Sequence, residues 1–316
     1  MAGPPRGDHT GNHAGDAGDT SGRGPTRRSL LAVTGAVAAV GATLGATAAC
    51  SRVSVAAKGE GGDLLQRLRA QGTVRLGIED EPPLSSIDKN GRLTGCDPEI
   101  ARRIFRRLGV PHVQPQPIEF NSLIAGLDSQ QFDVIAAGMY ITPKRCEKVL
   151  FADPHYEMTD EFIVPRGNPK KLHTYRDVAD RGATLATVEG YAEVGFARSA
   201  GVEHLVTVGT LQDGVDRVEQ KRADAFSTTT VTIRDFYYHR NRSSAVEYAQ
   251  PFNPLPHSSH LPGGGFAFRK EETKLRDAFN DELNKMKKSG ELVRLMRRFH
   301  FVPEEVSSQT AKELCG

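Results

Sequence analysis

A nearly uninterrupted run of apolar residues extends from Phe132 to Met139 and narrows the choice of fold class for this chain. Such runs are typical of strands buried on both faces of a parallel sheet. Thr142 and Pro143 follow at once, and a hydroxyl N-cap before a proline predicts the start of a helix. The order of strand, short loop and helix predicts an α/β fold. Its ligand site is expected at the carboxyl ends of the strands, beside exposed helix-start amides.

Two side chains at this corner carry possible binding chemistry. Tyr140 follows the strand and offers an aromatic face. Arg145 lies in the first turn of the predicted helix. The helix dipole does not stabilise a positive charge at this end of a helix. A ligand carboxylate would compensate, because it matches the guanidinium fork as a two-point pair. For Arg145 taken alone, a solvated surface residue is the plainer interpretation.

The length and charge of the chain limit its organisation and its partners. With 316 residues the chain is longer than one core usually organises, so two lobes are expected. Its net charge is only +2 and the basic residues are spread along the sequence, so no nucleic-acid groove is predicted. No CxxC, Walker, GxSxG or HExxH pattern occurs, so we expect no metal, no cofactor and no catalytic residues.

The first part of the chain reads as an export segment. Arg27 and Arg28 precede an uncharged apolar stretch and resemble a Tat signal, here assigned to residues 1–49. Cys50 ends a sequence that resembles a lipobox, which predicts a lipid anchor at the outer face of the cytoplasmic membrane. The alternative is a lone cysteine in a cleaved secretory peptide. Residues 50–63 are predicted to be a tether.

Strand and helix patterns alternate in two blocks after the tether. The first contains a strand at 73–79 and a helix for which Asp97-Pro98-Glu99 is the expected cap. EFIVPRG, residues 161–167, reads as a strand that crosses to the second block. After that block, residues 263–269 return the chain, and helices at 272–288 and 290–299 are expected to pack on the first block.

The spacing around Arg145 keeps a known signature at six positions: Gly138, Met139, Thr142, Arg145, Phe151 and Pro154. It resembles the G-M-x-x-T-x-x-R-x-x-x-x-x-F-x-x-P-Y pattern of the family 3 solute-binding proteins, the amino-acid receptors of ABC importers. Tyr156 is displaced one place by His155. The resemblance extends from about Leu64 to Phe301. In that family the matching arginine binds the α-carboxylate of the ligand. Thr142 of the same signature is a further expected ligand-binding residue.

The resemblance implies a type II periplasmic-binding-protein fold, with two α/β lobes joined by two hinge strands. Residues 64–163 plus 265–316 would form lobe I and residues 164–264 lobe II, with hinge strands near 161–165 and 264–268. Hinge closure would trap the ligand without covalent chemistry. The implied protein is a monomer that delivers its ligand to ABC permease subunits.

Within the family, the ectoine/hydroxyectoine receptors match best, through FNSLIAGLDSQQFDVIAAGMYITPKRCE, GYAEVGFA, GGGFAFR and TAKELC. Such receptors surround the ligand ring with aromatic side chains, bind its carboxylate with arginine and meet its ring nitrogens with glutamate. The positions that match these roles are Phe120, Tyr140, Arg145 and Glu81. Leu84 departs from the pattern, because a third aromatic residue is expected there.

In the second lobe, closure is expected to bring Gly190, Tyr191 and Thr229 over the ligand. Receptors for common α-amino acids usually carry an aspartate where this chain has Thr229. Glu189 adds a negative charge that would repel a carboxylate or recruit a more strongly cationic solute. The expected ligand is a small zwitterionic compatible solute or an amino acid. The alternative is a periplasmic lyase of the cyclohexadienyl dehydratase type, with Glu189 or Glu81 as acid or base.

Four cysteines occur, and Cys50 is assigned to the lipid. In an oxidising compartment the best pair among the rest is Cys146 with Cys315, which would tie the C-terminal tail to the helix of Arg145. Cys96 would stay unpaired. The alternative is that all three remain reduced.

Overall fold

The computed structural model describes residues 63–239, 245–258 and 260–316. The predicted export segment, the lipidation site at Cys50 and the tether up to residue 62 lie outside the described residues.

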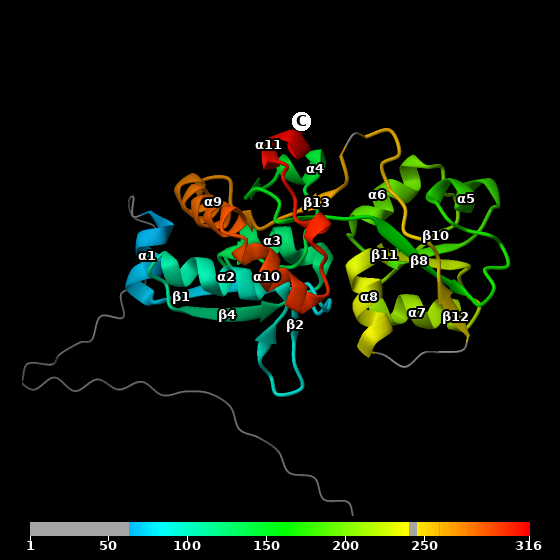
Figure 1. Ribbon diagram of the computed structural model, residues 1–316, viewed down its shortest axis with the longest axis horizontal. Coiled ribbons are helices and arrows are strands. Elements are labelled where there is room, and N and C mark those ends of the chain that lie inside the picture. The colour runs from blue at the N-terminus through cyan, green and yellow to red at the C-terminus, as the bar shows by residue number, and fades with distance from the viewer. Residues whose placement is uncertain (1–62, 240–244, 259) are drawn as a thin grey trace, which may run out of the picture. The chain divides into compact units, whose positions relative to one another are not determined.

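The first sheet contains five strands and is largely parallel. β1 pairs in parallel with β4, which lies beside it in Figure 1, and with β5, while β14 pairs antiparallel with β5 and β6. Because β14 comes from late in the chain, this sheet is built from two separate stretches of sequence. Its order is β4 (His112–Pro117), β1 (Thr73–Ile78), β5 (Val134–Ile135), β14 (Ala267–Phe268) and β6 (Leu150–Phe151).

The strand predicted at 132–139 is shorter in the structure, where β5 covers only Val134–Ile135. The whole run is nonetheless buried, as the apolar pattern requires. The chain then turns at Gly138, whose φ of 61° lies in the left-handed region that favours glycine. The run therefore supplies a core strand and also the bend that leads to Arg145.

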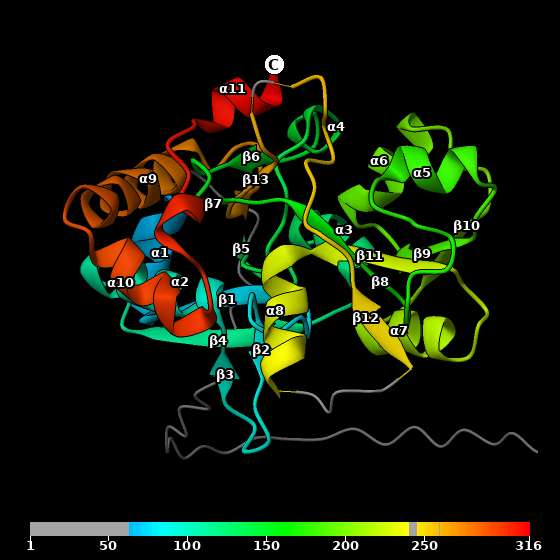
Figure 2. The same cartoon turned by 45° about the vertical axis from the view of Figure 1, so that its right-hand side comes forward.

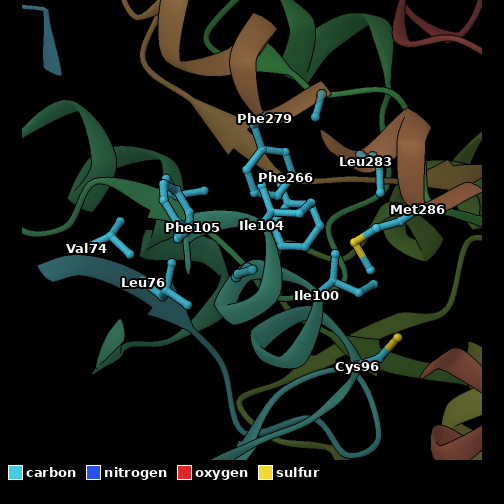
Figure 3. Packing of buried hydrophobic residues seen from close by; sticks show 14 of the residues in the cluster. Val74, Leu76, Cys96, Ile100, Ile104, Phe105, Phe266, Phe279, Leu283 and Met286 are labelled. Atoms are coloured by element: carbon cyan, nitrogen blue, oxygen red, sulfur yellow. The ribbon is translucent and has the colours of Figure 1, made fainter. Parts of the chain in front are cut away.

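Helices cover the first sheet and bury its largest apolar cluster (Figure 3). Ile100, Ile104 and Phe105 of α2 meet Phe279 and Leu283 of α9, and all five are fully buried. Their spacing places them on one stripe of each helix. The helices that contribute most of its residues are α1 (Leu64–Gln71), α2 (Cys96–Arg107), α9 (Thr273–Lys288) and α10 (Glu291–Met296). A separate cluster takes Leu123 and Leu127 of α3 (Leu123–Asp128), which follows the 3-10 turn η1 (Phe120–Ser122).

The predicted cap of α2 is wrong. The helix begins at Cys96 with Gly95 as its N-cap, and no side chain caps it. Asp97 lies inside the first turn with no exposed surface. A cap residue stays outside the helix to reach its free amides, whereas Asp97 faces the interior.

The second sheet also contains five strands. Helices lie on both of its faces (Figure 2). Phe162 and Val164 of β8 pack with Tyr175 of α5, while Ile163 packs on the other face with Val215 of α7. This alternation follows the two-residue period of a strand. The order is β10 (Leu205–Val208), β9 (Leu185–Val188), β11 (Ala225–Thr229), β8 (Asp160–Pro165) and β12 (Val246–Tyr248). The helices are α5 (Tyr175–Asp180), α6 (Ala192–Ser199), α7 (Leu211–Glu219) and α8 (Thr230–His239).

We call the elements packed on the first sheet the first lobe and those packed on the second sheet the second lobe. A separate antiparallel pair, β7 (Tyr156–Glu157) and β13 (Gly263–Gly264), connects the two. The hinge strands predicted near 161–165 and 264–268 are therefore found slightly earlier in the chain. β8, from Asp160 onward, is already part of the second sheet, and β14 is already part of the first sheet. Smaller elements are β2 (Ser86–Ile87), β3 (Leu93–Thr94), α4 (Pro143–Cys146), η2 (Arg297–Phe299), η3 (Pro303–Glu305) and α11 (Ala311–Cys315).

A disulfide joins α4 to α11, which lie side by side in Figures 1 and 2. It links Cys146 to Cys315, with the Cα atoms 5.7 Å apart, while Cys96 is buried and free. The bridge holds the C-terminal helix against the short helix that carries Arg145.

Replacing both bridge cysteines with serine is expected to lower the free energy of unfolding by about 2–4 kcal/mol, because the bond closes a long loop in the unfolded chain. Urea unfolding without reductant measures the loss. The wild-type protein with reductant is the matched control and should unfold at the midpoint of the double variant. Equal midpoints with and without reductant would contradict the expectation.

Candidate functional site

A small pocket lies where residues of the two lobes meet. The first lobe contributes Glu81, Phe120, Gly138, Tyr140 and Arg145, and the second lobe contributes Tyr191, Ala192, Glu193 and Thr229.

Arg145 is positioned by the local sequence that surrounds it. Thr142 caps α4, its hydroxyl accepting from the Arg145 amide, and Pro143 opens the helix. The guanidinium donates from Nη1 to the Tyr140 carbonyl at 2.7 Å and from Nη2 to the Gly190 carbonyl at 2.8 Å. Burial lowers the pKa of Arg145, yet a guanidinium with an intrinsic pKa above about 12 stays charged. The site thus holds a fixed cation whose fork is bonded to neutral carbonyls, which are weaker partners than a carboxylate.

Gly190 brings the second lobe close to the first. Its φ is 85°, and a Cβ there would lie 2.9 Å from the Cα of Asn121 in the first lobe. A contact this short leaves no space for a side chain. Glycine at 190 therefore allows the carbonyl that Arg145 binds to approach.

Aromatic rings form part of the pocket wall. The Phe120 and Tyr191 centroids are 4.7 Å apart with their planes at 68°, an edge-to-face arrangement. The Arg145 Cζ lies 5.2 Å from the Phe120 centroid, within cation–π range. Tyr140 is buried and completes the aromatic part of the wall.

Buried carboxyl groups make the site acidic. Glu81 is 3 % exposed and accepts hydrogen bonds from two second-lobe hydroxyls, Thr232 at 3.0 Å and Thr228 at 3.4 Å. Burial raises the pKa of Glu81 to about 7. Glu79 accepts from the Tyr191 hydroxyl at 3.0 Å, and burial together with the charge of Glu81 raises its pKa to about 9. Burial also raises the pKa of Glu193 well above its ordinary value.

Because buried carboxyl groups have raised pKa values, we expect the ligand-free protein to be less stable at pH 8 than at pH 5.5. Burial raises the pKa of Glu81 from 4.5 to about 7 and that of Asp160 from 3.8 to about 7. Between those values the folded state holds more protons than the unfolded state, so the free energy of unfolding falls as pH rises through that range. Thermal unfolding at both pH values checks this. Glu81→Gln should reduce the difference, and equal melting temperatures in the wild type would contradict it.

Most of the site residues predicted from sequence lie together in the pocket wall. Glu81, Phe120, Tyr140, Arg145, Tyr191 and Thr229 line it, and Gly190 meets Arg145 through its carbonyl.

Three other predicted residues are not brought to the wall. Leu84 is 1 % exposed and packs against Gly138, so it supports the wall from behind and presents no face to a ligand. Thr142 acts as the cap of α4. The Glu189 side chain is exposed and is not part of the wall, because the chain turns at Gly190 before α6 begins.

The sequence reading missed Glu193, which lines the pocket from the first turn of α6. An acidic residue in a first helical turn is ordinarily explained by the helix dipole, so the residue type gave no separate signal. Only its burial, at 1 % exposure, distinguishes it from an ordinary surface glutamate.

A buried network behind the pocket fixes the bend at Gly138. One oxygen of Asp97 accepts from the Gly138 amide at 2.8 Å and the other lies 2.8 Å from Nε2 of His155. The Tyr156 hydroxyl donates to the Gly138 carbonyl. Cys96, Asp97 and His155 also place potential metal-ligand atoms within 4.8 Å of one another. Because both Asp97 oxygens are already engaged, the arrangement is that of a structural support.

Within the part of the chain that the structure describes, none of the helices is both long and apolar enough to cross a bilayer.

Known proteins share this architecture and this sequence pattern. A probable amino-acid ABC transporter periplasmic-binding protein of Sinorhizobium fredii is 33% identical over 282 residues, which cover 86% of this chain and 93% of that protein. Among solved structures, EhuB in complex with hydroxyectoine has a TM-score of 0.74 at 33% identity, covering 80% of this chain and 97% of EhuB. The ancestral amino acid-binding protein AncCDT-1, a precursor of cyclohexadienyl dehydratase, has a TM-score of 0.66 at 27% identity, covering 75% of this chain and 99% of that one.

The sequence profile of the bacterial extracellular solute-binding proteins, family 3, matches residues 74–302. The two α/β lobes and their connecting strands are those of the type II periplasmic-binding fold. The chain therefore belongs to the family 3 solute-binding proteins, the extracytoplasmic receptors of ABC importers.

Proposed function

We propose that this receptor captures a small zwitterionic compatible solute or an amino acid and delivers it to ABC permease subunits. The observation that carries the proposal is the position of Arg145, whose guanidinium lines the pocket and reaches carbonyls of both lobes. A ligand carboxylate would take the place of the Gly190 carbonyl on this fork and form a charged two-point pair.

The other pocket groups have matching roles in the proposal. Phe120, Tyr140 and Tyr191 present aromatic faces to the ligand, and such faces attract cations. Glu81 accepts a hydrogen bond from the ligand's cationic nitrogen, which replaces the hydrogen bonds from the hydroxyls of Thr228 and Thr232. Lobe closure then covers the ligand with Gly190, Tyr191 and Thr229.

Ectoine and hydroxyectoine are the first candidate ligands. The support is the similarity to the hydroxyectoine complex of EhuB, together with the combination of arginine, glutamate and aromatic groups in the pocket. The relative from Sinorhizobium fredii supports amino acids as the wider class.

The receptor is proposed to act as a monomer that makes and breaks no covalent bond. The lyase alternative requires an acid and a base at the ligand. Glu189, one of its two candidate residues, is exposed and outside the pocket wall. Export by the Tat-like signal and anchoring through a lipid on Cys50 complete the proposal.

A thermal-shift screen of the purified protein tests the ligand class. The compounds are ectoine, hydroxyectoine, betaines and the common amino acids, because a ligand that binds only the native state raises the melting temperature. Compounds that raise it are then titrated by calorimetry. A screen in which none of them binds would overturn the proposed ligand class.

A further inference from the structure

One oxygen of the buried Glu193 carboxyl has no hydrogen-bond partner among the described residues. That oxygen is Oε1. Glu193 lies in the first turn of α6, is 1 % exposed and lines the pocket. A buried polar atom without a partner is costly, and native structures rarely retain one without a reason. A ligand group in the pocket would supply that partner.

The charges of the pocket wall indicate what kind of group this is. Glu81 and Glu193 are the two carboxyls of the wall, and Arg145 is its cation. When Arg145 is paired with a ligand carboxylate, both carboxyls are left for the rest of the ligand. A ligand with a single positive centre pairs with one of them, and the other then avoids an unpaired buried charge only by staying protonated.

The charged groups around Glu193 do not supply a second cation to pair with it. Asp160 and Glu81 are acidic and favour its protonated form, whereas Arg145 favours its ionised form. Asp160 is itself fully buried and bonded to the Tyr175 hydroxyl. The acidic side of the pocket therefore lacks a second cation.

We propose that Glu193 is a specificity-determining residue that binds a second cationic group, so that the ligand carries one carboxylate and two positive centres. This inference rests on the proposed function, in which Arg145 takes the carboxylate. One positive centre meets Glu81 and the other meets Glu193. The ligand class is that of small basic amino acids and amidines.

The test compares ligands that differ by one charge at nearly constant size. L-2,4-diaminobutyrate is paired with L-homoserine, and L-arginine with L-citrulline, while ectoine represents a single delocalised cation. Calorimetry on the wild-type protein should show the charged member of a pair binding at least tenfold more tightly than the neutral one. Ectoine should bind more weakly than the tighter of the two dicationic compounds.

Glu193→Gln keeps the size of the side chain and removes its charge. It should reduce the charged-to-neutral affinity ratio at least tenfold. Glu189→Gln, an exposed change just before the same helix, should leave the ratio unchanged. Equal binding of charged and neutral members by the wild type would overturn the inference, and so would a Glu193→Gln protein that keeps the wild-type ratio.

A measurement on the wild type alone guards against a variant that fails to fold. Binding a cation beside Glu193 favours its ionised form, so diaminobutyrate should release more protons than homoserine. Calorimetry in two buffers of different ionisation enthalpy measures that release, and equal release for both compounds would contradict the proposal. If ectoine or a neutral amino acid binds through Arg145 without any charge preference, the inference fails and the proposed function stands. If none of the compounds binds, both fail.

Discussion

Arg145→Ala is expected to weaken ligand binding at least tenfold, which corresponds to about 1.4 kcal/mol or more. The guanidinium lines the pocket and donates to carbonyls of both lobes. Its removal takes away the proposed partner of the ligand carboxylate and also a bond that joins the lobes. Truncating one member of a buried charged pair commonly costs more than the tenfold minimum, because the other charge stays unpaired. Calorimetric titration with the tightest ligand from the screen measures the loss.

Two neighbouring changes serve as controls. Arg145→Lys keeps the positive charge and loses the two-point fork, so it should bind with an affinity between those of the wild type and Arg145→Ala. Lys144→Ala removes an exposed cation from the same short helix and should leave the affinity unchanged. Unchanged affinity in Arg145→Ala would end the proposed role of this residue as the carboxylate partner.

Asp97→Ala is expected to lower the free energy of unfolding by about 2–5 kcal/mol. Its two oxygens serve the Gly138 amide and His155, and both Asp97 and His155 have no exposed surface. The substitution leaves two buried polar groups without partners and removes the support of a bend in the pocket wall. Urea unfolding monitored by circular dichroism measures the change.

Two matched variants show whether the loss of stability comes from the hydrogen bonds of Asp97 or from the removal of any aspartate. Asp97→Asn keeps the shape but presents a donor to one of the two sites, so its loss should be smaller than that of Asp97→Ala. Asp128→Ala removes an exposed aspartate at the end of α3 and should change stability by less than about 0.5 kcal/mol. An Asp97→Ala protein as stable as Asp128→Ala would show that the network does not support the fold.

The order of strands and helices was predictable because each depends on local sequence. The apolar run at 132–139 marked a buried strand, and Thr142-Pro143 marked the start of α4. The length of that strand was not predictable, because the bend at Gly138 is held by Asp97, which is distant in sequence. Asp97 was wrongly predicted to cap α2, because its actual partners, Gly138 and His155, come from distant segments of the chain.

The acidic residues near the start of α6 illustrate what sequence reading misses. Glu189 and Glu193 are the same residue type, four positions apart, and only Glu189 was predicted to bear on the ligand. The structure leaves Glu189 exposed and buries Glu193 in the pocket wall. The turn at Gly190 separates the two residues, and a Cβ at that position would lie 2.9 Å from the Cα of Asn121 in the other lobe.

The amino-acid sequence alone determined the α/β architecture and the family signature, and it singled out Arg145 as the proposed partner of a ligand carboxylate. These follow from periodicity, capping and spacing, which act between residues close in the chain. Tertiary structure alone decided which carboxyls are buried beside that arginine and which of their oxygens are left without a hydrogen-bond partner among the described residues. Burial and pairing depend on segments that meet only after folding, when glutamates from both lobes are removed from water around one small pocket.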